Sequence, residues 1–181
     1  MPDRDPAPAP IPRYYQGCRL RSTLEGRWLV WLDALRVPWV YEVEGYPIRV
    51  DRERRGYLPD VFLPREDRFI EIKPALVPVE EALYEEFARL LRRDLLLVQG
   101  SPWPDEHEVT VYQPEGNVLR GLVWALGRTN HDELWLFRSH PEPFAYPLSG
   151  RVNGDHWPLA DCEALRQAYR RARGYQFWTP R

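Results

Sequence analysis

The apolar residues of this chain recur with two periods, and the change of period separates helices from strands. Residues 22–36 and 78–93 carry apolar side chains three and four positions apart, which predicts two amphipathic helices. A third stretch with this period covers residues 159–173. Short apolar runs rich in β-branched and aromatic residues predict strands at 39–43, 58–63, 69–72, 94–100, 109–112, 118–125 and 133–137.

The order of these elements predicts an α/β fold with a mixed central β-sheet flanked by helices. The runs at 58–63 and 69–72 are separated by a polar turn, so they predict a hairpin. The later strands predict an antiparallel C-terminal extension, and a final helix follows them. We therefore expect a Pro/Ala-rich flexible arm at 1–13 and a single domain at 14–181, with its core at 22–100 and its extension at 101–181.

Composition narrows the class of protein only slightly. The chain has 181 residues, of which 44% are hydrophobic, so it can bury one sizeable core. Its net charge of −2 gives no global signal of polyanion binding, and a nucleic-acid surface would have to be a local basic patch. Cys18 and Cys162 lack zinc spacing and a disulfide framework, which favours a reducing compartment. With no apolar run of membrane length, we expect a cytoplasmic protein without membrane contact.

Three charged residues interrupt the predicted hairpin. Asp60 lies near the start of its first strand, and alternation places Glu71 and Lys73 on one face of the second strand. Burying two carboxylates and an ammonium among apolar side chains is costly unless they pair or hold a metal. The pattern therefore predicts a site at this hairpin.

The chemistry of these groups favours a divalent metal. Two converging carboxylates repel each other, and a hard cation such as Mg²⁺ neutralises them and accepts their oxygens. Such an ion polarises a phosphate and lowers the pKa of a bound water, while Lys73 can orient that water or stabilise developing charge. The alternative is a buried ion pair of Lys73 with Glu71 or Asp60 in a binding protein.

Pro59-Asp60 and Glu71-Ile72-Lys73, eleven positions after Asp60, together resemble the signature of the PD-(D/E)XK nuclease superfamily. Restriction enzymes, Holliday-junction resolvases and transposase endonuclease subunits belong to this superfamily. Its core runs helix, three-strand meander, helix, strand, and residues 22–99 follow that order. Residues 168–177 also resemble the C-terminal end of small phage and bacterial proteins that carry this core.

The resemblance implies a restriction-endonuclease-like fold and hydrolysis of DNA, double-stranded or branched, with Mg²⁺ or Mn²⁺. It implies that Asp60, Glu71 and the backbone carbonyl of Ile72 hold the metal, and that Lys73 is catalytic. Many relatives act as dimers to cut both strands, so a homodimer is a further expectation. A non-catalytic DNA-binding or assembly subunit with this fold is the alternative, and the sequence leaves RNA open as a substrate.

The first predicted helix offers an accessory acid. In the resembling family, a helix before the meander often adds an acidic residue to the metal site, and Glu25 fits that role. However, Ser22-x-x-Glu25 before an apolar run is also a capping box, in which both side chains satisfy backbone donors at the helix start. The two roles are not exclusive.

Two arginine-rich segments and one tyrosine are candidate nucleic-acid contacts. Residues 49–56 predict a solvated hairpin tip that either steers a phosphate backbone or is only a soluble loop. On the final helix an arginine stripe either faces the site or pairs with Asp161 and Glu163 in solvent. Tyr84 on the second helix either reaches the phosphate, as in the family, or packs at the core edge. The candidates are Arg52, Arg54, Arg55, Tyr84, Arg166, Arg170 and Arg173.

Overall fold

The computed structural model describes residues 13–128, 133–138, 144–149 and 158–179. The helices are α1 (Thr23–Ala34), α2 (Glu81–Leu91) and α3 (Glu163–Gly174). The strands are β1 (Arg13–Tyr15), β2 (Cys18–Leu20), β3 (Val40–Tyr41), β4 (Tyr46–Val50), β5 (Glu53–Tyr57), β6 (Val61–Leu63), β7 (Arg68–Lys73), β8 (Leu95–Gly100), β9 (His107–Tyr112), β10 (Val118–Leu126), β11 (Leu134–Arg138) and β12 (Phe144–Pro147).

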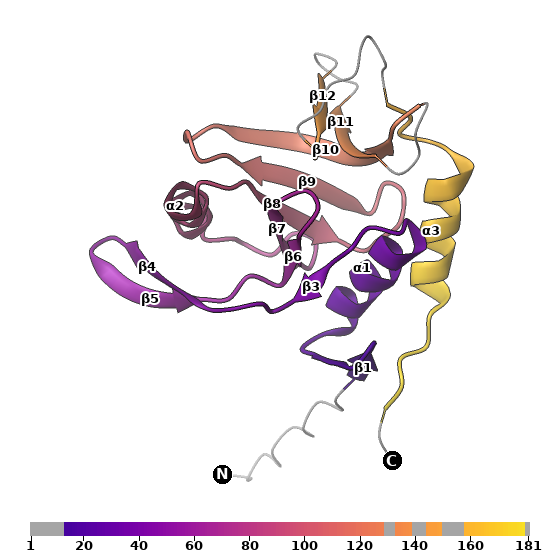
Figure 1. Cartoon of the computed structure of the whole chain (residues 1–181), viewed down its shortest axis with the longest axis horizontal. Helices are drawn as coiled ribbons and strands as arrows, with labels where there is room; N and C mark the ends of the chain where they lie inside the picture. The colour runs from indigo at the N-terminus through magenta and orange to yellow at the C-terminus, as the bar shows by residue number, and fades with distance from the viewer. Residues whose placement is uncertain (1–12, 129–132, 139–143, 150–157, 180–181) are drawn as a thin grey trace, which may run out of the picture.

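A mixed sheet of eight strands, ordered β12-β11-β10-β9-β8-β7-β6-β3, forms the centre of the molecule (Figure 1). Among the described strands, β7 and β8 form the only parallel pair, and α2 lies between them in sequence. Parallel neighbours require such a crossover, whereas the antiparallel strands are joined by turns. The predicted α/β class with a mixed sheet and an antiparallel extension is therefore confirmed.

The part of the sheet that carries the site is a meander of β3, β6 and β7. β3 pairs with β6 and β6 with β7, both antiparallel, and α2 then leads to β8. Between β3 and β6 the chain forms a separate hairpin, β4–β5, which projects from the sheet beside α2 (Figure 1). The sequence order helix, three strands, helix, strand is thus present, with this hairpin inserted in the meander.

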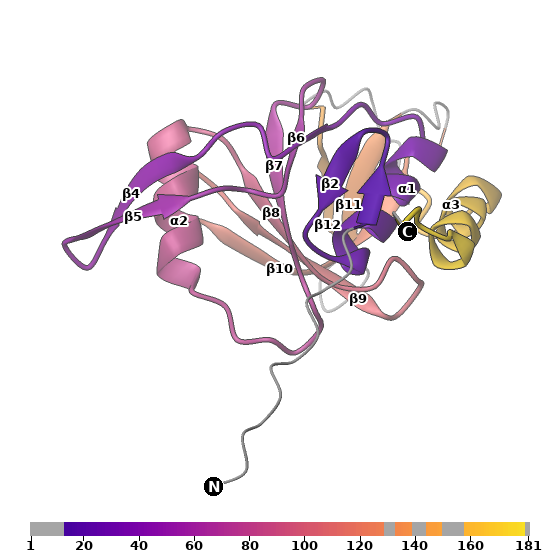
Figure 2. The same ribbon diagram turned by 90° about the horizontal axis from the view of Figure 1, so that it is seen from below.

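The two faces of the sheet have separate cores. Ile70, Ile72 and Leu96 pack on the side of α1 and α3, whereas Phe69 and Leu97 pack on the side of α2 and the hairpin. Figure 2 shows α1 with α3 and α2 with β4–β5 on opposite sides. Because side chains alternate along β7, Glu71 lies on the Phe69 side.

Helix α1 is almost wholly enclosed, because it lies between the sheet and α3. Five consecutive residues, 28–32, are buried. On another side of the helix, a Cβ at Gly26 would lie 2.5 Å from the ring of Phe177, so glycine lets the C-terminal segment cross the helix there. This packing fixes the first turn of α1 against the core.

Several element boundaries differ from the predicted ones. β3 ends after Tyr41, because Glu42 has a positive φ of 46°. α3 begins four residues later than predicted, since Leu159 forms a bridge with Leu126. β1, β2 and β12 were not predicted. The predicted arm lies outside the described residues except for Arg13, which begins β1. None of the described helices has the length and apolar character needed to cross a bilayer.

Candidate functional site

Asp60 is fixed against the end of β7. It directly precedes β6, and the register that pairs Val61 with Ile70 places Asp60 beside the last residues of β7. Its Oδ2 accepts a hydrogen bond from the Ile72 N–H at 2.7 Å, and the side chain is buried. The carboxylate is therefore held between Glu71 and Lys73 along the strand.

Glu71 and Lys73 lie on the same face of β7, as the alternation predicts. Glu71 is 3% exposed, and its Oε2 accepts a hydrogen bond from the Tyr57 hydroxyl at 2.8 Å. Its other oxygen forms an ion pair with the Lys73 ammonium. The Lys73 side chain is 34% exposed, so its ammonium contacts the buried Glu71 carboxylate and is also accessible to solvent.

Arg21 pairs with Asp60 from the solvent side. Its guanidinium contacts Asp60 Oδ1, and its Nε lies 2.7 Å from Oε1 of Glu42. The Arg21 side chain is half exposed, whereas Asp60 is buried. A charged side chain with this exposure can swing away from Asp60 into water at low cost.

Glu25 forms the predicted cap and also lies near Asp60. Ser22 Oγ accepts from the Glu25 N–H at 3.1 Å, and the Glu25 carboxylate accepts from the Arg21 N–H at 3.2 Å. The Tyr41 hydroxyl donates to the same carboxylate oxygen. The capping interpretation is confirmed, and the accessory role of Glu25 in a metal site stays a prediction.

The electrostatics of the site centre on Asp60. Burial raises the pKa of its carboxyl group to about 7, and the charges of Glu71 and Glu25 act in the same direction. The Ile72 N–H and the Arg21 guanidinium oppose this rise. Burial and the Glu71 charge likewise raise the pKa of Tyr57, so its hydroxyl group stays protonated at neutral pH and donates its hydrogen bond to Glu71.

The oxygen atoms around Asp60 determine which metal ion the site could hold. Within the described part of the chain, no group of three or more His, Cys, Asp or Glu side chains is arranged to hold a metal ion. Asp60 and Glu71 supply two carboxylates whose charges interact. Mg²⁺ typically binds one or two carboxylates and completes its shell with water and substrate phosphate, so two carboxylates with a nearby backbone carbonyl suit it.

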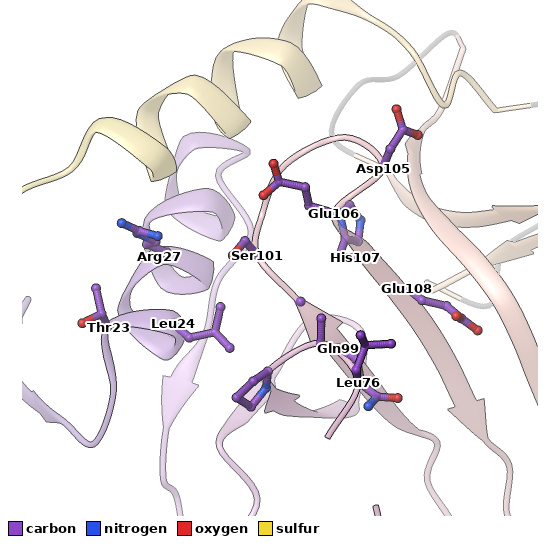
Figure 3. A pocket seen from close by; sticks show the side chains of 13 residues that line it. Thr23, Leu24, Arg27, Leu76, Gln99, Ser101, Asp105, Glu106, His107 and Glu108 are labelled. Carbon is purple, nitrogen blue, oxygen red and sulfur yellow. The ribbon is translucent and has the colours of Figure 1, made fainter. Parts of the chain in front are cut away.

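A cleft of about 880 Å³ opens where β7 and β8 end. Pro74, which follows Lys73, and Gln99, the register partner of Lys73, belong to its lining. Thr23, Leu24 and Arg27 of α1 and several residues of the β8–β9 connection line it, and Figure 3 shows Leu24 pointing from α1 toward Gln99 and Leu76. Asp60, Glu71 and Lys73 do not belong to that lining, so the carboxylate site adjoins the cleft only through Pro74 and Gln99. The cleft has the size that holds small ligands.

The arginines of the β4–β5 hairpin lie away from the sheet. Arg52 and Arg54 are exposed, and Arg55 pairs with Glu53 at 3.1 Å and with Glu80 at 2.7 Å. The predicted solvated tip is present. Its contact with nucleic acid stays a prediction.

Tyr84 is buried between the rings of Tyr57 and Tyr112, with centroids 6.0 and 5.5 Å away. Burial and the charge of Glu71 raise the pKa of its hydroxyl group. This packing is what the core-edge interpretation expects.

The three arginines predicted to form one stripe on α3 have different kinds of partner. Arg166 pairs with Asp161 at 2.7 Å, and both Arg166 and Arg170 pair with Glu163. These are the pairs that the solvent-facing alternative predicts. Arg173 instead lies over the ring of Trp103, 4.5 Å from its centroid.

Arg21, Tyr41 and Tyr57 contact the site carboxylates and were not predicted. Arg21 precedes α1, Tyr41 lies in β3 and Tyr57 ends β5. No local spacing in the sequence therefore connects these three residues. Only the strand pairing brings them together.

Comparison of the chain with protein-family models, with curated proteins and with solved structures finds no match.

Proposed function

We propose that this chain is a metal-dependent endonuclease that hydrolyses phosphodiester bonds in DNA. The observation that supports this most is the meeting of Asp60, Glu71 and Lys73 at one end of β7, beside an open cleft. The order of α1, the β3-β6-β7 meander, α2 and β8 is consistent with a restriction-endonuclease-like core of the PD-(D/E)XK type. Double-stranded or branched DNA is the proposed substrate, and a homodimer would let two sites cut two strands.

The donors favour Mg²⁺ or Mn²⁺ as the cofactor. Asp60, Glu71 and the Ile72 carbonyl would hold the ion, and Glu25 lies near enough for its charge to raise the pKa of Asp60. When bound, a divalent cation offsets charge on the phosphate and lowers the pKa of water. The fit rests on Asp60, because burial and then its acidic neighbours raise the pKa of its carboxyl group, and a cation placed beside it would favour the ionised form.

Lys73 has the properties of a group that acts on the substrate. Glu71 fixes its position, and its partial exposure lets it donate a hydrogen bond to a phosphate oxygen as charge develops there. It is also the only lysine in the chain, since 24 of the 25 Lys and Arg residues are arginine. A compact ammonium differs from a planar guanidinium in geometry and hydration. An arginine would serve if this position only paired with Glu71, so the use of lysine here favours a role in the reaction.

A cleavage assay with matched variants tests the proposal. Purified protein is incubated with supercoiled, linear, single-stranded and branched DNA, and with RNA, in Mg²⁺ or Mn²⁺. We expect cleavage by the wild type, and a loss of at least about a thousandfold in Asp60→Asn, Glu71→Gln and Lys73→Met. Glu115→Gln, which changes an exposed turn residue, serves as the control and should cleave like the wild type.

The second candidate is a non-catalytic DNA-binding or assembly subunit. The ion pairs of Lys73 with Glu71 and of Arg21 with Asp60 favour it, because they satisfy the carboxylates without a metal. Lys73→Arg separates the two candidates, since arginine keeps the charge and can pair with Glu71. An enzyme should lose cleavage in Lys73→Arg while its unfolding temperature stays unchanged. If the wild type cuts none of these substrates in either metal, the binding subunit is the better account.

A further inference from the structure

Two arginines from different helices line one cavity at the end of the cleft that lies away from Lys73. The cavity has a volume of about 320 Å³. Arg27 of α1 and Arg173 of α3 line it together with Ser101, Trp103 and Glu106 of the β8–β9 connection. Arg27, Ser101 and Glu106 also line the larger cleft, so the two hollows are neighbours that share these residues as a common wall. In Figure 3, Arg27 lies on α1, Ser101 and Glu106 lie on the β8–β9 connection, and Leu76 and Gln99 lie together below them in the view.

These two guanidinium groups lack anionic partners. Within the described residues neither Arg27 nor Arg173 forms an ion pair, in contrast to Arg166 and Arg170 on the same face of α3. The Nε of Arg27 is buried and has no hydrogen-bond acceptor. An unsatisfied buried donor costs about 1–3 kcal/mol, and an anion in the cavity would remove that cost. Glu106 supplies one carboxylate against two cations, which leaves room for a singly charged anion such as a phosphodiester.

Arg173 is held in place by an aromatic ring. Its Cζ lies 4.5 Å from the centroid of Trp103, within the range of a cation–π contact. The contact orients the guanidinium over the cavity without neutralising it. A preorganised arginine loses less conformational freedom when it binds a phosphate.

The lining of the larger cleft indicates which part of a nucleic acid it can hold. Asp105, Glu106 and Glu108 disfavour phosphate along that wall, whereas Leu24 and Leu76 offer apolar surface to sugars and bases. A volume of about 880 Å³ is that of a small-ligand pocket, so it suits one unpaired strand and not a duplex. Phosphates would then lie at its two ends.

We infer that Arg27 and Arg173 form an anion subsite for one backbone phosphate of an unpaired DNA strand that passes through the cleft from Asp60, Glu71 and Lys73. The inference rests on the proposed function for the identity of the strand. It narrows the substrate class to DNA with a single-stranded segment, such as a branch or a frayed end, in preference to a continuous duplex.

Binding without cleavage tests the subsite. The full chain carrying Glu71→Gln is titrated with fluorescein-labelled oligothymidylate and with a duplex of equal length in Ca²⁺, and anisotropy is followed over a range of salt concentrations. Arg27→Gln with Arg173→Gln should weaken single-strand binding about tenfold or more and reduce the slope of log K against log salt by about 1. Arg171→Gln removes an exposed arginine from the same helix and should change affinity less than about twofold.

The outcomes separate this inference from the proposed function. Arg27→Lys with Arg173→Lys keeps the charge and should restore the salt slope, which a purely structural role would not produce. The subsite is refuted if the double glutamine variant, folded by circular dichroism, binds like Arg171→Gln, or if the parent chain does not bind the oligonucleotide. If binding depends on both arginines but the wild type never cleaves DNA, the subsite stands and the endonuclease proposal fails.

Discussion

Charged side chains gather at both ends of strand β7. Acidic and basic groups are equal in number at the start of the strand, whereas acidic groups are in excess at its end. At the start of the strand, three carboxylates meet three arginines. The pairs there are Glu66 with Arg65 at 2.7 Å, Asp94 with Arg68 at 2.9 Å and Asp67 with Arg93 at 2.6 Å. At the end of the strand, four carboxylates meet two cations. The carboxylates are Glu25, Glu42, Asp60 and Glu71, and the cations are Arg21 and Lys73.

The difference separates a structural cluster from a candidate site. At the start of β7, the buried Asp94 also accepts a hydrogen bond from Tyr146, so this carboxylate has two partners from distant segments. At the end, burial and neighbouring acids raise the pKa of Asp60. Such an excess of acid lowers stability and is typical of sites that bind a cation or act as acids and bases. The contrast predicts opposite responses to removal of an acid.

Asp60→Asn should stabilise the protein above neutral pH, and this is the largest expected effect. The pKa of Asp60 is about 7 in the folded chain and near 4 when unfolded, so the folded state binds more protons between these values and stability falls as pH rises. Each pH unit of this interval corresponds to about 1.4 kcal/mol, which sets an upper limit of roughly 4 kcal/mol at pH 8. Urea unfolding of both proteins from pH 4 to pH 8 measures the difference.

The pH dependence of that difference is the sharper part of the test. It should be largest at pH 8 and vanish near pH 4, where Asp60 is protonated in both states. A difference that does not change with pH would contradict the raised pKa of Asp60.

Asp94→Ala should destabilise the protein at neutral pH by about 3 kcal/mol. The change leaves the Arg68 guanidinium without its carboxylate and removes the acceptor of the Tyr146 hydroxyl, and breaking a buried pair by removing one partner costs this much. Urea unfolding at pH 7 checks the value. Stabilisation by Asp94→Ala would contradict the comparison between the two ends of β7.

The sequence predicts the main elements because their patterns are local. The helix at 22–36 is α1 with its Ser22 cap, and the strand at 69–72 lies within β7. The shared face of Glu71 and Lys73 also follows from alternation alone. The single lysine is a further local signal, visible in the composition, that marks Lys73 among the many arginines.

The partners of the site carboxylates could not be predicted, because they depend on contacts between distant segments. Arg21 reaches Asp60 across 39 positions, and Tyr57 reaches Glu71 across 14. No periodicity connects residues that meet only after β3, β6 and β7 have paired. The β4–β5 hairpin is similar, since its separation from the main sheet follows from tertiary packing against α2.

Arg21→Gln should have the smallest effect on stability and a visible effect on metal binding. The pair joins a half-exposed arginine to a buried carboxyl group whose pKa is about 7, so Asp60 can take up a proton when Arg21 is lost, and the cost should stay below that of Asp94→Ala. Because Arg21 competes with a cation for Asp60 Oδ1, its removal should tighten Mn²⁺ binding severalfold in calorimetric titration. Weaker Mn²⁺ binding would mean that Arg21 supports the metal site by holding Asp60 in place.

Diffraction at the manganese absorption edge from crystals soaked in Mn²⁺ tests the central claim most directly. We predict an anomalous peak between the carboxylates of Asp60 and Glu71, within bonding distance of the Ile72 carbonyl, with Arg21 displaced from Asp60. The account is contradicted if no peak lies there at saturating Mn²⁺ while the Arg21–Asp60 and Lys73–Glu71 pairs remain intact.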